Sequence, residues 1–339
     1  MSNVAERHEP KTYSFWERNR KSNGILLKKT IGRGAISVIR FLLLFGLCFM
    51  IIQPLLMKLS LSFMTESDLY DTTVTVLPRH LTTENYELAA SDALLSYWPS
   101  LFNTFWISLV TAILQVAACT VVGYGFARFD FPLKKFWFAC VILVIIIPPQ
   151  TISTSLYMYF SNFDIFGIIG AITGTGKGIN IRNSFTPYAL MSATCMGLKD
   201  GLYIFMIRQY FKGIPMSLEE AAYVDGCSNF HTFWKVMLPD ALPIMTSCFL
   251  FAFVWQWTDR FYTNNFLRGF QTLSANLPSI QQRLNMLKTI NGESAQVSIS
   301  RVQQMISTGV VMTIIPLLIV YVVGQRGFVE SLATSGLKD

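Results

Sequence analysis

The chain has few charged residues for its length, and this shortage excludes an ordinary soluble protein. Of its 339 residues, 14 % are Asp, Glu, Lys or Arg, whereas soluble domains carry about 25 %. Hydrophobic residues make up 52 %, including 27 Phe and 7 Trp. The apolar excess also excludes a disordered chain, because disordered segments contain few such side chains. The composition therefore predicts a membrane protein.

Residues that bind metals or perform catalysis are also scarce. There are 3 His and 6 Cys, and no two of the Cys form a CxxC pair. The Gly-rich stretch at 173–178 lacks the Gly and the Ser or Thr that a phosphate-binding loop needs at its two ends. We therefore expect no metal site, no bound cofactor and no enzymatic activity in this chain.

Several apolar runs are long enough to cross a membrane. A span needs about 20 mostly apolar residues, and it must be helical because lipid offers the backbone no hydrogen-bond partners. The fourth run is the weakest, since Lys199 and Asp200 interrupt it. The predicted fold class is all-α, a polytopic membrane protein with six spans at 35–57, 101–124, 136–151, 185–206, 242–260 and 304–324.

Basic residues predict how these spans are oriented. A leader, residues 1–34, is rich in Lys and Arg, and basic flanks mark the cytoplasmic side of a membrane. This flank accounts for much of the net charge of +7, so we expect no nucleic-acid partner. We predict a multi-pass protein of the bacterial cytoplasmic membrane, in contact with lipid. Its leader, the segment 207–241 and the tail 328–339 are then cytoplasmic, and 58–100, 152–184 and 258–303 lie outside.

The cytoplasmic loop 212–241 carries the most information. Ser217 is expected to cap a short helix whose first turn holds two Glu, where the helix dipole favours acids. Gly226 is expected to end this helix, because Gly readily adopts the left-handed conformation found there. A second short helix, Asn229 to Met237, is expected to stop before Pro239. The loop then consists of two helices joined by a tight turn.

The order of residues in this loop resembles a known family. Glu220-Ala221-Ala222, Asp225-Gly226 and Leu238-Pro239 are similar to the EAA loop of the membrane-spanning subunits of binding-protein-dependent ABC importers. The longer sequence from Ile214 to Lys235 resembles the same loop in carbohydrate importers, in the subunit type represented by the smaller maltose permease. The resemblance also covers Tyr124–Phe129, Pro148-Pro149 and Gln325–Val329. It implies the type I importer transmembrane fold, with residues 35–327 as a single transmembrane domain.

The resemblance further implies a function and a set of partners. The chain would move a carbohydrate by alternating access, together with a second permease subunit, two ATP-binding subunits that hold ATP and Mg, and an extracytoplasmic solute-binding protein. Small alanines would let the loop lie in a groove of the ATP-binding subunit. The residues implied to couple transport to ATP hydrolysis are Glu219, Glu220, Ala221, Ala222, Asp225, Gly226, Leu238 and Pro239.

Polar residues within the spans are candidates for the solute path. A charge at the bilayer centre costs about 2.5–3.5 kcal/mol, so it usually serves a function. Lys199 and Asp200 fit this description, although they could instead mark an interface or a bend in a broken helix. Trp255, Trp257 and Asp259 lie near the outer end of the fifth run, where Trp also serves as an interfacial anchor.

Two alternatives remain open from the sequence. An importer of a non-sugar solute would share the EAA loop. A secondary transporter would need carboxylates at the midplane or inverted repeats, and neither is visible in the sequence.

Overall fold

The computed structural model describes residues 16, 20, 25–172, 174, 176–292 and 296–336. Most of the predicted leader, residues 173 and 175 of the Gly-rich stretch and the tail residues 337–339 lie outside this part. The described residues are mainly helical and form no strand longer than two isolated bridges, Met64 with Leu81 and Phe163 with Ile179. The predicted all-α class is confirmed. The chain divides into two units, residues 1–59 and 60–339.

The first unit consists mainly of helix α2 (Ile25–Ser62), whose last residues begin the second unit. Its segment Ile31–Ser62 is long and apolar enough to cross a membrane. Apolar side chains around this helix are exposed, among them Phe41, Leu47 and Ile51. A helix that is apolar on all sides requires lipid or protein around it. The first predicted span is therefore a helix.

In the second unit, two more helices meet the requirements of a span. They are Tyr97–Arg128 and Ile299–Gly327, and they contain the second and sixth predicted spans. Two bent pairs also meet them when each pair is taken as one span: Lys134–Ile146 with Pro149–Ser161, bent by 102°, and Asn229–Asp240 with Leu242–Thr258, bent by 71°. The described residues thus hold three to five candidate spans, and the predicted number of six is not confirmed.

The fourth predicted span, 185–206, is not a continuous helix. Its residues belong to α9 (Thr186–Ala193) and α10 (Asp200–Gly213), and an irregular segment lies between them. Cys195 and Lys199 in this segment have left-handed backbone angles, with φ values of 57° and 67°. A non-glycine residue rarely adopts these angles, and they cannot continue a right-handed helix. The predicted span 185–206 is thus interrupted, and Lys199 and Asp200 mark the bend in a broken helix that the sequence analysis gave as an alternative.

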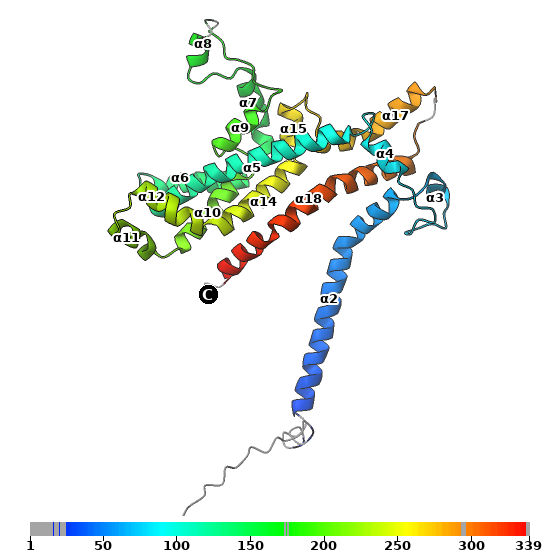
Figure 1. The fold of residues 1–339 in the computed structure, drawn as a ribbon, viewed down its shortest axis with the longest axis horizontal. Helices are drawn as coiled ribbons and strands as arrows, with labels where there is room; N and C mark the ends of the chain where they lie inside the picture. Colours follow the sequence, from blue (N-terminus) through cyan, green and yellow to red (C-terminus); the bar gives the residue numbers. More distant parts are fainter. Residues whose placement is uncertain are drawn as a thin grey trace, which may run out of the picture. The chain divides into compact units, whose positions relative to one another are not determined.

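The helices of the second unit pack around α5 (Tyr97–Arg128). Helix α5 contacts α10 and α14 (Leu242–Thr258), and α14 contacts α18 (Ile299–Gly336), as Figure 1 shows. Gly123 permits the contact between α5 and α10, because a Cβ atom there would lie 2.9 Å from Ile207. Large side chains fill the core between these helices, including the buried Tyr203, Phe211 and Trp257. Burial of such side chains supplies most of the packing energy.

The shorter elements lie at the ends of these helices. Figure 1 shows α11 and α12 at one end of the second unit and α4 and α17 at the other. The remaining bounds are α3 (Glu66–Tyr70), α4 (Glu84–Ala90), α6 (Lys134–Ile146), α7 (Pro149–Ser161), α8 (Ile168–Ile172), α11 (Met216–Val224), α12 (Asn229–Thr232), η1 (Phe233–Met237), α13 (Leu238–Asp240), α15 (Phe261–Phe266), α16 (Leu273–Asn276), η2 (Leu277–Ser279) and α17 (Ile280–Ile290).

Candidate functional site

The predicted coupling loop forms two helical segments joined by a tight turn. Helix α11 ends at Val224, and Gly226 follows with a φ of +82°. The N–H of Gly226 donates to the carbonyl of Tyr223, and the N–H of Cys227 donates to that of Ala222. These bonds satisfy carbonyls that the helix end would leave unpaired. The predicted role of Gly226 in ending the helix is confirmed.

Two local predictions in this loop are wrong. Helix α11 begins at Met216 with Pro215 as its N-cap residue, so Ser217 lies inside the first turn and does not cap it. The second helical segment does not stop before Pro239 but runs from Asn229 to Asp240. Pro239 occupies the first turn of α13, directly after the π-helical turn η1. Proline is tolerated in a first turn, since its missing N–H has no partner there in any case.

The eight predicted coupling residues divide into exposed and buried groups. Glu219 and Ala222 are buried, with exposed fractions of 3 % and 8 %, and Leu238 is half-buried. Ala222 therefore packs against its own chain, and of the two alanines only Ala221 is exposed. The exposed members, which are available to a partner, are Glu220, Ala221, Asp225, Gly226 and Pro239.

An apolar surface surrounds these exposed residues. Its members, here called the elbow patch, are Met216, Leu218, Val224, Phe230 and Trp234. Val224 is 87 % exposed and Phe230 is 70 % exposed, and the rings of Phe230 and Trp234 stack with centroids 6.3 Å apart. The patch belongs to the loop for which the charge pattern predicts a cytoplasmic location. An exposed apolar patch outside lipid is typical of a protein-binding surface.

A buried ion pair fixes the elbow, the name used here for α11, the turn at Gly226 and the helical segment Asn229–Asp240, to the transmembrane helices. Arg128 is the last residue of α5, and its Nε lies 2.9 Å from Oε1 of Glu219 on α11. The two side chains are only 8 % and 4 % exposed. The contact is ionic, because these two atoms form no aligned hydrogen bond.

Arg128 makes further contacts with the beginning of the same loop. Its Nη2 donates to the carbonyl of Ile214 at 2.8 Å, and its Nη1 lies 3.3 Å from the sulfur of Met216. One guanidinium thus holds the start of α11 at three points. Sequence reasoning included Glu219 but missed Arg128 as its partner. The signal available was that both residues fall on the same predicted side of the membrane.

The predicted solute-path residues separate into two groups, of which one pair is accessible. The Nζ of Lys199 lies 4.7 Å from the centroid of the Trp255 ring. Trp255 is 42 % exposed and Lys199 is half-buried. A cation over an indole face is attracted by the ring quadrupole. The structure therefore brings Lys199, which directly precedes α10, and Trp255 of α14 together on a surface that other molecules can reach.

The other three candidates are buried within the chain. The carboxylate of Asp200 accepts a hydrogen bond from the N–H of Gly197 at 2.6 Å, and the residue begins α10, where the helix dipole favours an acid. Trp257 is fully buried, and its Nε1 donates to the carbonyl of Thr313. Asp259 accepts hydrogen bonds from the hydroxyl of Tyr188 and the N–H of Thr263. Burial excludes direct contact with solute in this conformation.

Helix α5 carries a polar face that the sequence analysis did not identify. Its buried members are Ser100, Thr104, Ser108, Thr111 and Gln115, and Thr120 is buried on the opposite side of the helix. The hydroxyls of Thr104, Thr111 and Thr120 donate to carbonyls one turn earlier in the same helix. Small polar residues bonded in this way allow membrane helices to approach closely. The face therefore serves helix packing.

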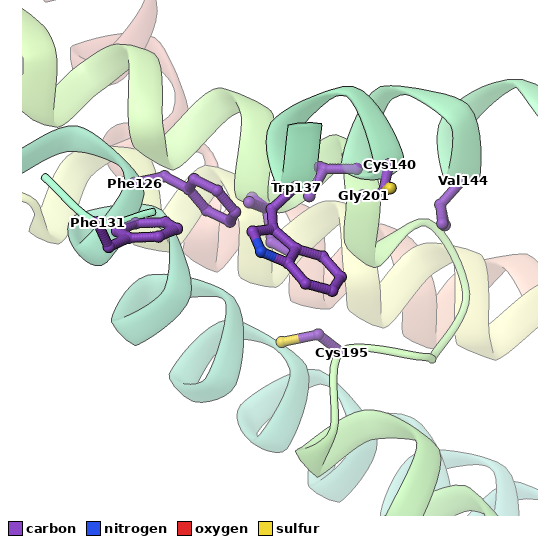
Figure 2. A pocket seen from close by; sticks show the side chains of 9 residues that line it. Phe126, Phe131, Trp137, Cys140, Val144, Cys195 and Gly201 are labelled. Atoms are coloured by element: carbon purple, nitrogen blue, oxygen red, sulfur yellow. The ribbon is translucent and has the colours of Figure 1, made fainter. Parts of the chain in front are cut away.

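An apolar pocket of about 280 Å³ lies between α5, α6 and α10. Figure 2 shows Trp137 in its middle, with Phe126 and Phe131 on one side and Cys195 on a neighbouring segment. Its lining offers almost no hydrogen-bonding groups, so it cannot recognise the hydroxyls of a sugar. Within the described part of the chain, no group of three or more His, Cys, Asp or Glu residues comes together to hold a metal.

Comparisons with known proteins agree with this geometry. A family model for binding-protein-dependent transport system inner membrane components matches residues 119–331. The arabinooligosaccharides transport system permease protein AraQ of Halalkalibacterium halodurans is 27 % identical over 295 residues, which cover 86 % of this chain and 93 % of the relative. The maltose/maltodextrin transport system permease protein MalG of Photorhabdus laumondii is 26 % identical over 310 residues, covering 88 % and 94 %.

A solved structure shares the fold. It is a bacterial ABC transporter involved in the import of the acidic polysaccharide alginate, and one of its chains matches with a TM-score of 0.65. The match covers 88 % of this chain and 98 % of the other, at 18 % identity. At this level of identity the likeness establishes the fold alone.

Proposed function

The chain belongs to the family of binding-protein-dependent transport system inner membrane components, and on this basis we propose that it is a permease subunit of an ATP-driven carbohydrate importer. Its relatives from Halalkalibacterium halodurans and Photorhabdus laumondii carry the names of oligosaccharide and maltodextrin permeases, which supports a carbohydrate as solute. ATP hydrolysis then takes place on separate subunits, and this chain contributes no catalytic residue.

The elbow is the observation that carries this proposal. It exposes apolar side chains and the small Ala221 on its outer surface, while Arg128 and Glu219 fix its inner surface to α5. A partner that moves the elbow therefore also moves α5. In the proposed mechanism, the ATP-binding subunits bind the elbow patch and close around nucleotide, and α5 with its packed neighbours tilts between inward-facing and outward-facing states.

The remaining parts of the importer follow from this mechanism. A second, related permease subunit completes the path, two ATP-binding subunits dock on the cytoplasmic side, and an extracytoplasmic binding protein delivers the solute. The elbow and both termini then lie in the cytoplasm. In this proposal the solute path is lined by the accessible pair Lys199 and Trp255, whose Nζ and ring centroid lie 4.7 Å apart.

Replacement of Ala221 by Trp tests the proposal. Because Ala221 is exposed, the indole adds bulk without disturbing the core, and it blocks docking. The expected result is normal insertion in the membrane but loss of co-purifying ATP-binding subunits and of binding-protein-stimulated ATP hydrolysis. Lys212→Trp, at an exposed position on α10, is the matched control and retains both. Full ATP hydrolysis in Ala221→Trp would contradict docking at the elbow.

A further inference from the structure

A second pocket lies far from the elbow, in the segment after α14, and its lining is polar and basic. It has a volume of about 330 Å³, within the range of about 300–1,000 Å³ that is typical of small-molecule sites. No acidic side chain is among the residues that line it. The side chains that give it its character are Asn264, Arg268, Phe270, Gln271, Asn276 and Arg283, and it is called here the arginine pocket.

The wall of the arginine pocket is held in place by the beginning of α5. The amide nitrogen of Asn276 donates to the carbonyl of Leu95 and to the hydroxyl of Ser100, both at 2.9 Å. The amide of Asn103 donates to the carbonyl of Gln271 at 2.9 Å. These contacts span more than 160 residues of sequence and join the pocket to a long helix. The site is therefore preformed, which lowers the entropy lost on binding.

Arg283 is fixed within this wall. Its Nη2 donates to Oδ1 of Asn276 at 2.9 Å, and its Nη1 donates to the carbonyl of Leu94 at 2.5 Å. A guanidinium has five N–H donors, so these two bonds leave donors for a ligand. Within the described part of the chain, none of the ion pairs includes Arg283. The positive charge is thus oriented by neutral acceptors and is not neutralised by a carboxylate.

Arg268 provides a second positive charge at the rim. Its Nε donates to the carbonyl of Asn264 at 3.2 Å, and its side chain is exposed. It too belongs to none of the ion pairs among the described residues. The acid nearest to Arg268 along the chain, Asp259, is buried and accepts hydrogen bonds from the N–H and the hydroxyl of Thr263. Two guanidinium groups at one pocket favour an anion, and a carboxylate fits their planar fork.

The other side chains of the pocket indicate which class of molecule contains that anionic group. Asn264 and Gln271 are exposed amides, and each offers donors and an acceptor that suit hydroxyl groups. Phe270 is 38 % exposed, and the negative face of its ring attracts the C–H groups of a sugar. A simple phosphate or a lipid headgroup would need the two arginines but neither the amides nor the ring. Hydroxyls, a ring face and a carboxylate together describe an acidic sugar.

In the proposed importer, the arginine pocket lies where a solute would enter from the outer side of the membrane. It is attached to α5 near Thr104, through the bond from the N–H of Leu273, whereas the elbow is attached to Arg128 at the other end. A rise of about 1.5 Å per residue separates Thr104 from Arg128 by roughly 36 Å, more than the thickness of the hydrocarbon layer. If the elbow is cytoplasmic, as the proposed function requires, the arginine pocket faces the outer side.

We propose that the arginine pocket binds a sugar that carries a carboxylate, a hexuronate residue, on the outer side of the importer. Arg268 and Arg283 bind the carboxylate, the amides of Asn264 and Gln271 bind hydroxyls, and Phe270 packs against the sugar ring. This inference deepens the proposed function and rests on it, because a sugar reaches this face only if the chain is part of an importer. It assigns the solute to the acidic sugars.

Saturation-transfer NMR on the full chain in phosphatidylcholine nanodiscs tests this binding without any partner subunit. The probes are galacturonate and glucuronate, with galactose and glucose as neutral counterparts and acetate as a simple carboxylate. The expected result is transfer to at least one of the two hexuronates, at least about tenfold weaker binding of its neutral counterpart and of acetate, and weakening by salt. Equal binding of hexuronate and neutral hexose, equal binding of acetate, or no transfer to either hexuronate would overturn the proposal.

Variants at exposed positions show whether the pocket itself is responsible. Arg268→Gln lowers hexuronate affinity about tenfold, the loss expected for one charge-assisted contact, and Arg268→Lys lowers it less. Arg260→Gln, an exposed arginine outside the pocket, leaves it unchanged. An Arg268→Gln variant that binds hexuronate like the wild type overturns the assignment.

Two further measurements separate the possible sources of failure. The chain should bind hexuronate equally well in nanodiscs that contain phosphatidylglycerol and in phosphatidylcholine nanodiscs. Loss of binding in the phosphatidylglycerol nanodiscs would identify a lipid headgroup as the ligand and overturn the assignment of a sugar. The NMR experiment needs no ATPase. If hexuronate fails to bind but Ala221→Trp loses its ATP-binding subunits as expected, only the proposal for the arginine pocket is rejected. Failure of ATP-binding subunits to co-purify with the wild-type chain rejects the proposed function, whatever the pocket binds.

Discussion

At the scale of single residues, the contact between Arg128 and Glu219 determines how the elbow is held. Both groups are nearly inaccessible to water, and a buried charge that loses its partner remains desolvated without compensation. A pair of this kind adds little net stability compared with an apolar pair, but it defines one geometry. We therefore assign to it the transmission of movement between the elbow and α5.

A double-mutant cycle tests this assignment. Arg128→Gln and Glu219→Gln each leave one buried charge and should destabilise the protein by about 3–5 kcal/mol. The combination of both leaves no charge and should cost less than the sum of the two. Thermal unfolding in detergent measures stability, and binding-protein-stimulated ATP hydrolysis measures coupling. Strict additivity of the two single changes would show that these side chains do not interact.

Asp68 is a second residue whose role depends on its charge state. It lies in α3 outside the predicted spans, and the hydrogen bond from the backbone N–H of His80 is the main cause that lowers the pKa of Asp68 below its ordinary value of 3.8. Because the pKa is lowered in the folded state, the ionised carboxylate stabilises this loop at pH values above 3.8, the ordinary pKa of Asp. The stabilisation is lost as the pH falls through the folded-state pKa.

Hydrogen exchange of the Arg79 and His80 amides measures this effect, because both donate to Asp68. We expect protection at pH 6, corrected for intrinsic exchange rates, that is retained at pH 3.8 and decreases at lower pH, where the carboxylate becomes protonated. Asp68→Asn should show weak protection throughout this pH range. Protection in Asp68→Asn at pH 6 as strong as in the wild type would contradict this account of the loop.

At the scale of elements, the sequence predicted the two-helix elbow but not its exact limits. The Asp225-Gly226 turn was predictable, because Gly at a helix end has a specific conformational reason. The cap at Pro215 and the passage of the helix through Pro239 were not, since both depend on packing and on a π-helical turn that has no clear sequence signal. The break between α9 and α10 was indicated by the weak apolar run and by Lys199 and Asp200, for which a bend in a broken helix was one of the alternatives.

Gly226 allows a test of the elbow's angle. No atom lies within 4 Å of the position that a Cβ would occupy, so Gly226→Ala costs only backbone strain, about 1 kcal/mol. Proline requires a φ near −65°, against +82° here, and it removes the N–H that donates to Tyr223. Gly226→Pro should abolish coupled ATP hydrolysis while the protein still reaches the membrane. Gly226→Ala should retain most of it. Equal activity of the two variants would contradict the role of this turn.

At the scale of the whole molecule, the class and the family were predictable and much of the site was not. Composition and apolar runs predict helices in lipid because they reflect the bilayer thickness directly. The assignment of five polar and aromatic residues to the solute path stays a prediction. The structure brings Lys199 and Trp255 together at an accessible surface and buries Asp200, Trp257 and Asp259. Burial depends on contacts between distant segments, which a single sequence does not reveal.

The long helix α5 connects the features that matter for function. The elbow is fixed to its last residue, Arg128, and the arginine pocket to its first turn through Ser100. In the proposed mechanism, the nucleotide-driven movement and the sugar-binding surface therefore share one helix. In this account, movement at one side of the membrane reaches the other through α5 and the helices packed around it.

Photo-cross-linking from the elbow patch tests the central claim most directly. Phe230, which is 70 % exposed, is replaced by p-benzoylphenylalanine in the assembled complex, and Phe166, which is 99 % exposed in the segment predicted to lie outside, is replaced in the same way as a control. The account predicts an adduct with an ATP-binding subunit from position 230 and none from position 166. An adduct between position 230 and the extracytoplasmic binding protein would contradict it, and so would the absence of an adduct with any protein subunit.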